Sequence, residues 1–142
     1  MPTSSAGFDI FAVTADKGIR AWGPEPAAVY RQAAHGLWSL MVEPASVERR
    51  REIPVAVEAD DRESLLVAWL NELLYLHETE RFAAADCRIV SLSETRLDAE
   101  VWGETLDMAR HVIVGHVKAV TYHQLSVGQT AGGWEARVVV DV

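Results

Sequence analysis

Cysteine is almost absent from this chain of 142 residues, because Cys87 is the only one and no intrachain disulfide can form. Long apolar runs are absent too: even the segment 65–76 is interrupted by Asn71 and Glu72, well short of the roughly 18 consecutive apolar residues that a membrane span requires. The first residues carry neither the basic nor the apolar part of a secretion signal. We therefore expect a cytoplasmic protein with no membrane partner.

Basic residues are outnumbered: 13 Lys and Arg face 21 Asp and Glu, so the formal net charge is −8. Binding to a nucleic-acid backbone requires clustered Lys and Arg side chains that displace its counterions. Strong direct binding to nucleic acid is therefore not expected, and cations or basic protein surfaces are the favoured partners. The basic run Arg49–Arg51 has no aromatic residues between its arginines and predicts a solvent-exposed loop.

Familiar catalytic motifs are missing as well. The chain has no glycine-rich dinucleotide or phosphate loop, no nucleophile elbow, no Cys-x-x-Cys and no His-Glu-x-x-His. His111, His116 and His123 lie close together in sequence, but in one extended strand the second would point away from the other two. This pattern favours separate polar roles over a zinc site. Cys87, in a strand-like run, is expected to be a small buried hydrophobic residue.

Two segments have helical periodicity. The first follows the Gly-Pro-Glu sequence at 23–25 and is expected to end before Pro44, because proline disfavours helical backbone in the residue that precedes it. The second, Asp61–Thr79, has an apolar stripe that is expected to face the core. Asp60 and Glu63 have the spacing of a capping box at the start of this second helix.

The remaining apolar and β-branched segments predict strands. They are residues 8–13, 19–22, 55–59, 88–90, 97–102, parts of 112–127, and 134–142. Gly128–Gly133 is the expected hairpin turn between the last two strands. Strands and helices come first and a run of strands follows, with no repeat or linker. The order predicts an α+β fold, a single domain over 1–142 with two helices packed on a mainly antiparallel sheet.

Two acidic residues stand out by position. Asp16 lies in an expected turn after the first strand, and Asp141 ends the final apolar strand next to Val142. If the first and last strands are neighbours, these groups would meet, and a hard cation such as calcium or magnesium would relieve the repulsion between the carboxylates. Composition alone favours ordinary turn or cap residues. Lys118 interrupts a strand-like run, and pattern alone favours an exposed strand residue over a phosphate contact.

Five stretches of the chain, in the same order, resemble the archease family. They are Thr14-Ala15-Asp16 with Gly18-Ile19-Arg20-Ala21, Trp69–Leu76, Gly103-Glu104 with Leu106-Asp107 and Arg110-His111, Val117–His123, and Trp134–Val142. Each stretch is short, but together they run from Val13 to the end of the chain. The resemblance implies the archease, or SHS2-like, fold, which is of the strand–helix–strand–strand type.

The resemblance also implies an accessory protein rather than an enzyme. Archeases activate the RtcB-type RNA-splicing ligase: they promote attachment of a guanylyl group to the ligase and let it turn over repeatedly in tRNA splicing or RNA repair. Some members modulate a tRNA methyltransferase. The family holds a divalent cation, often calcium, with residues that correspond to Asp16, Asp141 and the last main-chain oxygen, here that of Val142. The functional lysine of the family corresponds to Lys118.

Two positions depart from the family pattern. Val13 stands where the motif usually begins with a histidine, which implies weaker metal binding unless another group replaces the ring. Lys17 follows Asp16 where the family commonly has an apolar residue, and its ammonium would compete with a cation if it turned inward.

Two other functions stay open at this point. One is a metal-dependent phosphohydrolase that uses the same acidic residues, with His111 or His123 as the general base. The other is an adaptor that keeps an RNA methyltransferase in a soluble, specific state, for which the helix faces would matter and the acidic residues would not.

Overall fold

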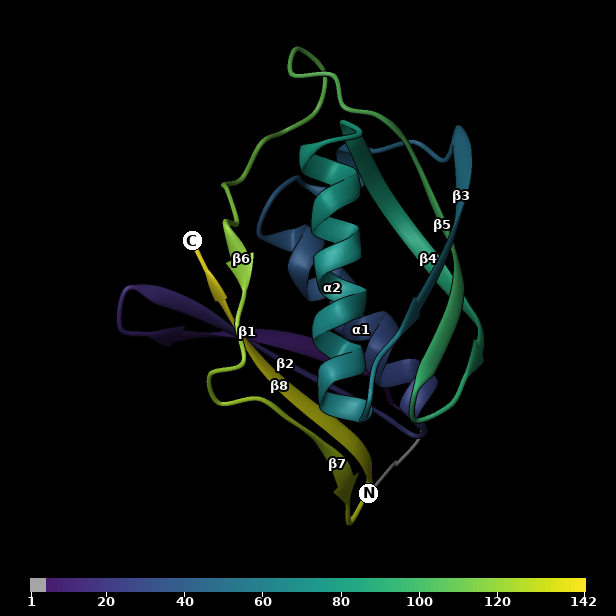
Figure 1. The fold of residues 1–142 in the computed structure, drawn as a ribbon. Coiled ribbons are helices and arrows are strands. Elements are labelled where there is room, and N and C mark those ends of the chain that lie inside the picture. Colours follow the sequence, from purple (N-terminus) through teal and green to yellow (C-terminus); the bar gives the residue numbers. More distant parts are fainter. Residues whose placement is uncertain (1–4) are drawn as a thin grey trace.

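Two antiparallel sheets enclose two helices in the computed structural model, which describes residues 5–142 (Figure 1). The larger sheet has the order β1 (Gly7–Val13), β2 (Asp16–Gly23), β8 (Gly133–Asp141) and β6 (Ala119–Val120), and β7 (Ser126–Thr130) also pairs with β8. The smaller sheet has the order β3 (Arg51–Glu58), β5 (Arg96–Thr105) and β4 (Phe82–Leu92). The predicted α+β class with two helices and antiparallel strands is confirmed.

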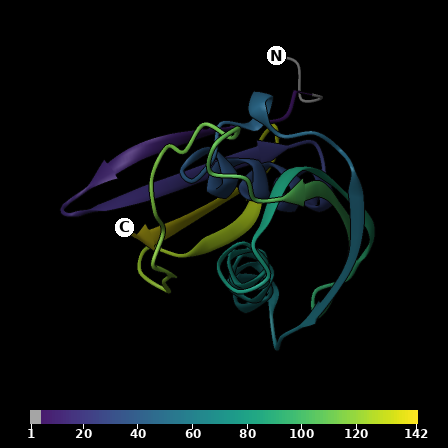
Figure 2. The same ribbon diagram turned by 90° about the horizontal axis from the view of Figure 1, so that it is seen from above.

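The helices lie between the sheets, as the view from above makes clear (Figure 2). Helix α1 (Pro26–Ser39) packs against β2 of the larger sheet and β4 of the smaller one. Helix α2 (Arg62–Glu78) contacts β3 and β4 on one side and β6 and β7 on the other. The apolar stripe predicted for α2 is buried, and Leu65 and Val67 are buried beside it because the helix is covered on two sides.

The start of α2 differs from the prediction by one residue. Asp61, and not Asp60, is the N-cap: its backbone is extended and its Oδ1 accepts a hydrogen bond of 2.7 Å from the Ser64 amide. The expected box between Asp60 and Glu63 is therefore wrong. An aspartate at either position has the right chemistry, and only the backbone geometry selects the one that caps.

Several strands also differ from their predicted bounds. β2 starts at Asp16 and not at 19, and β3 starts at Arg51, which was predicted as part of a loop, and not at 55. β4 starts at Phe82, well before the predicted 88–90, because small alanines at 83–85 carry little strand signal but fit under the neighbouring elements. Residues 128–130, predicted as turn, belong to β7 and pair with β8, so the connection itself is shorter. The short helix η1 (Pro44–Ser46) lies in the segment predicted as a loop.

Among residues 5–142 no helix is both long and apolar enough to cross a bilayer.

Gly103 provides a test of the packing between β4 and β5. A Cβ added to Gly103 would clash with the carbonyl oxygen of Ala83, a main-chain atom that cannot turn aside, whereas a Cβ at Gly128 would meet no atom within 4 Å. We expect Gly103→Ala to lower the free energy of unfolding by about 1–3 kcal/mol, as overpacked sites do. The matched control Gly128→Ala should leave it nearly unchanged. Urea unfolding measures both, and equal effects would contradict this packing.

Candidate functional site

Residues from four strands form one row across the end of the larger sheet. The register pairs Asp16 with Val13 in β1 and with Asp141 in β8, and Asp141 with Ala119 in β6. Directly paired residues of an antiparallel sheet project to the same face. Val140, the neighbour of Asp141 in β8, belongs to the hydrophobic core. The row Val13, Asp16, Asp141 and Ala119 therefore lies on the face that points away from the helices.

The strand order corrects one condition of the sequence analysis. The first and last strands are not neighbours, because β2 lies between them. Asp16 nevertheless reaches Asp141, since it is the first residue of β2 rather than part of a turn. The turn itself is Thr14–Ala15, and Ala15 has φ 64°, a left-handed conformation that a residue with a Cβ adopts at some cost.

The two carboxylates face each other without a cationic partner. Among residues 5–142, neither Asp16 nor Asp141 takes part in an ion pair or a side-chain hydrogen bond. Like charges directly opposite in a sheet destabilise it, and a cation between them relieves the repulsion. Within the same residues no cluster of three or more Asp, Glu, His or Cys side chains is suited to a metal. A hard cation at this pair would have to take its other ligands from main-chain oxygens and water.

Lys118 and Val142 lie at the same end of the sheet. The Lys118 amide donates a hydrogen bond of 2.7 Å to the Asp141 carbonyl oxygen, and Val142 follows Asp141 directly. The Lys118 side chain is exposed, and its ammonium forms no ion pair within the described residues. The structure thus brings Asp16, Asp141, Val142 and Lys118 together, while their role as a metal and phosphate site stays a prediction.

Lys17 does not share the row. It pairs with Val140, so strand alternation directs it to the opposite face from Asp16, and its side chain is exposed. Competition between the Lys17 ammonium and a cation at Asp16 is therefore not supported by this arrangement.

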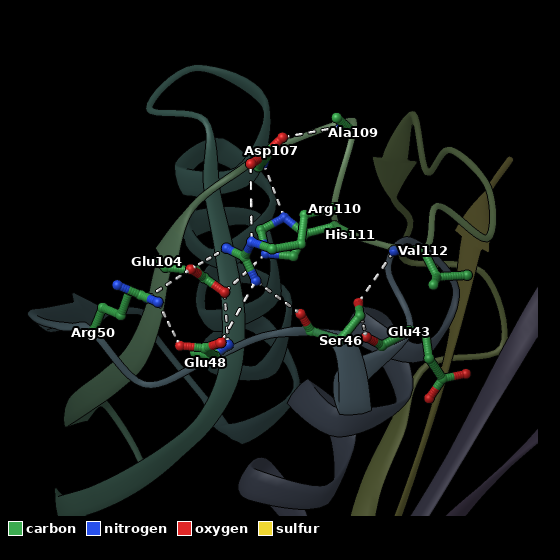
Figure 3. A network of polar contacts seen from close by, with 10 residues as sticks. All are labelled: Glu43, Ser46, Glu48, Arg50, Glu104, Asp107, Ala109, Arg110, His111 and Val112. Carbon is green, nitrogen blue, oxygen red and sulfur yellow. Dashed lines mark hydrogen bonds and ion pairs between the residues drawn. The ribbon is translucent and has the colours of Figure 1, made fainter.

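A second polar cluster surrounds the buried carboxylate of Glu104, at the end of β5 (Figure 3). Its oxygens accept hydrogen bonds from the guanidinium of Arg110, from the Glu48 amide at 2.7 Å and from His111 Nε2 at 2.9 Å. Arg50 adds an ion pair at 3.4 Å. The hydrogen bonds, that from Arg110 foremost, outweigh desolvation and lower the pKa of Glu104 to about 2.

The protonation of His111 follows from its two partners. Its Nδ1 accepts a hydrogen bond of 2.9 Å from the Asp107 amide, so Nε2 carries the proton that is donated to Glu104. The ring is fully buried. The sequence marked Glu104, Arg110 and His111 only as parts of a resemblance, and their spacing in the chain gave no sign that they form one network. The network ties the end of β5 to the segment 44–50 and to the connection that leads to Lys118.

A third cluster surrounds Asp86 in β4. Burial raises the pKa of this carboxyl, but hydrogen bonds from Arg31, His35 and the Cys87 amide outweigh that effect and lower it to about 2. Arg49 also pairs with Asp86, at 2.9 Å. The run predicted as a solvated loop is therefore exposed but anchored. Cys87 is buried as predicted, and its burial raises the thiol pKa to about 12, which excludes an activated nucleophile.

The three clustered histidines have separate partners. His111 faces Glu104, and His116 Nε2 lies 2.9 Å from the Glu78 carboxylate. His123 Nε2 lies 3.3 Å from the side-chain nitrogen, Nε2, of Gln124.

Comparison with known proteins gives a consistent result. The model of the Archease protein family (MTH1598/TM1083) matches residues 8–142. The chain belongs to the archease family. It is 34% identical to protein archease of Methanosarcina mazei over the whole of both chains, and 38% identical to that of Thermococcus gammatolerans, with 91% of this chain and 94% of the relative covered.

The solution structure of Methanobacterium thermoautotrophicum protein 1598 is also similar to this archease. It superposes with a TM-score of 0.79 at 32% identity and covers 96% of this chain and 99% of the other. The resemblance and the fold expected from it are therefore confirmed.

Acid should weaken the Glu104 network in this archease. The carboxyl titrates near its ordinary value of 4.5 in the unfolded chain but near 2 in the folded one, so the unfolded state binds more protons in between. The stabilisation is fully present above about pH 4.5 and is lost progressively as the pH falls toward 2. Glu104→Gln should be less stable than the wild type near neutral pH and should lose less stability in acid.

Urea unfolding over an acidic pH series measures this difference. Glu80→Gln, at an exposed glutamate that forms no ion pair within the described residues, is the control and should follow the wild-type profile. If the acid profiles of Glu104→Gln and the wild type coincide, the network does not contribute to acid sensitivity.

Proposed function

We propose that this archease family member activates an RtcB-type RNA-splicing ligase in the cytoplasm. It promotes guanylylation of the ligase and lets it turn over repeatedly in tRNA splicing or RNA repair. The observation that carries the proposal is the direct pairing of Asp16 with Asp141 across two strands, beside the hydrogen bond from Lys118 to Asp141. Family membership over residues 8–142 gives this geometry its context.

Asp16, Asp141 and a main-chain oxygen of Val142 are the groups that would hold a divalent cation, calcium or magnesium. When bound, such an ion offsets negative charge on a phosphate and binds its oxygens. The sheet holds Asp16 and Asp141 in place before any ion arrives, because both are fixed by strand pairing. Lys118, exposed and hydrogen-bonded through its amide to Asp141, adds a positive group for the phosphate of the guanylyl nucleotide.

The same geometry supports an accessory protein over a phosphohydrolase. Hydrolysis needs a base that can reach a water molecule at the metal. Of the two candidate bases, His111 is buried and donates to Glu104, so it is not available at the carboxylate row, whereas His123 is exposed. The site is also open, since Asp141, Val142 and Lys118 are all exposed at one end of the sheet. Because these charged groups are open to solvent, a partner protein can reach them and supply the reacting groups itself.

The net charge of −8 also supports contact with a protein partner rather than with RNA. An acidic chain is repelled by the phosphate backbone of RNA, while it is attracted to a basic protein that handles RNA. Contact with the ligase and not with the RNA is therefore the favoured arrangement.

The first test removes the carboxylates. Asp16→Asn and Asp141→Asn keep the size of each side chain but lose its charge, so we expect each to lower ligase guanylylation at substoichiometric activator by about tenfold or more, as loss of a metal donor does. Asp60→Asn, at an exposed aspartate outside the row, is the control and should activate like the wild type. Full activation by both row variants would remove these residues from the mechanism. Capture of a tRNA methyltransferase that survives both substitutions would favour the adaptor function.

A second test restores the residue that the family usually has. Val13 pairs directly with Asp16 on the same face, so a histidine there would place a ring nitrogen beside the carboxylate pair. We expect Val13→His to bind calcium or magnesium more tightly than the wild type, measured by calorimetric titration. Ala12→His changes the adjacent position on the opposite face and should not. Equal affinities of the wild type and Val13→His would contradict a cation site at this row.

A further inference from the structure

The connection between β5 and β6 exposes an unusual number of large apolar side chains. The exposed fractions are 60% for Met108, 56% for Val112, 42% for Ile113 and 55% for Val114. Single exposed apolar residues are common on soluble proteins, but a contiguous group marks a surface that another molecule covers. In Figure 1 this connection runs over the end of the fold and leads down to β6.

Residues 112–114 form a single antiparallel bridge, between Ile113 and Val42, and the other edge of this segment is open. It pairs with the segment 41–43 through hydrogen bonds from the Glu43 amide to the Val112 carbonyl at 2.8 Å and from the Val114 amide to the Met41 carbonyl at 2.9 Å. Strand alternation then directs the N–H and C=O of Ile113 to the other side. Neither group has a hydrogen-bond partner among residues 5–142. We call residues 112–114 the open edge.

The open edge is held in place at both ends. The Val112 amide donates to Ser46 Oγ at 3.2 Å, and His111, the preceding residue, is locked into the Glu104 network. Val117, on the other side, is fully buried. An edge fixed in this way can accept a further strand without first being ordered, which removes part of the entropic cost of binding.

We propose that the open edge binds an extended, apolar segment of the RtcB-type ligase, which adds to it as a strand; this rests on the function proposed above. The unpaired N–H and C=O of Ile113 require an extended backbone as partner. Val112 and Val114 project to one side and require apolar side chains on it. Lys118, which is hydrogen-bonded to Asp141, follows Val114 by four residues on the same connection, so a ligase segment bound at the open edge would contact the chain that leads to the carboxylate row.

Charge favours this occupant over a second copy of the chain. Glu43 and Asp107 border the open edge and are exposed; Asp107 is paired with Arg110 at 3.9 Å, while the Glu43 carboxylate points away from the neighbouring network (Figure 3). Glu43 forms no ion pair within the described residues. Such a border attracts a basic protein that handles RNA. Two copies with a charge of −8 each repel one another.

The test compares Val112→Asp and Val114→Asp with Val90→Asp. Val90 lies on β4 with 52% of its surface exposed, so the control adds the same charge at a similarly exposed valine. We expect the two edge variants to bind purified RtcB-type ligase about tenfold more weakly or worse, since each removes an apolar anchor and places a charge against an apolar strand. Val90→Asp should bind like the wild type. Calorimetric titration measures the affinity.

Two further measurements make the outcome specific. Calcium binding and Tm of the edge variants should match those of the wild type, and the milder pair Val112→Thr and Val114→Thr should weaken ligase binding in the same direction. If the edge variants bind the ligase as tightly as Val90→Asp does, while Asp16→Asn still abolishes activation, only the docking surface is overturned. If the wild type neither binds nor activates the ligase, both the proposed function and the docking surface are overturned. In that case, a concentration-dependent dimer that is lost in Val112→Asp would show that the open edge binds a second copy of the chain.

Discussion

The pairing of β2 with β1 on one side and with β8 on the other is the interaction on which the candidate site depends. A slip of one residue would turn every side chain of a strand to the other face, so the register is what places Asp16 opposite Asp141. Gly18 supports this register, because the ring of Phe11 occupies the space that a Cβ at Gly18 would need. Val139, next to Gly18 in the adjacent strand, is buried on the same face, so the carboxylate row stands beside a packed apolar row.

The Glu104 network holds the connection between β5 and β6 in position. A buried carboxylate is costly unless charged and hydrogen-bonded groups surround it, and here Arg110, His111 and the Glu48 amide do so. The network therefore fixes the long connection near its start, while the hydrogen bond from Lys118 to Asp141 fixes it near its end. Between these two points the chain can keep an apolar, partly unpaired strand in water without losing its position.

Several features in this part of the molecule lower the stability of the isolated chain. Two carboxylates are paired across strands without a Lys or Arg partner among residues 5–142, Ala15 is left-handed, and three apolar residues of the open edge face solvent. Each is unfavourable alone, and features of this kind gather where a protein binds something else. Asp16, Asp141 and Lys118 meet at one end of the larger sheet, and this is the end that we propose as the functional one.

The sequence by itself determined the class of fold, the two helices and most of the strands, because amphipathic periodicity and β-branched runs act locally. It also singled out Asp16, Asp141 and Lys118 by their positions, although their expected roles came only from the family resemblance. The identity of the N-cap, the strand status of residues 128–130 and the Glu104 network were decided by tertiary structure. Opposed strands, buried hydrogen bonds and exposed edges join residues far apart in the chain, and no local pattern specifies which partners they meet.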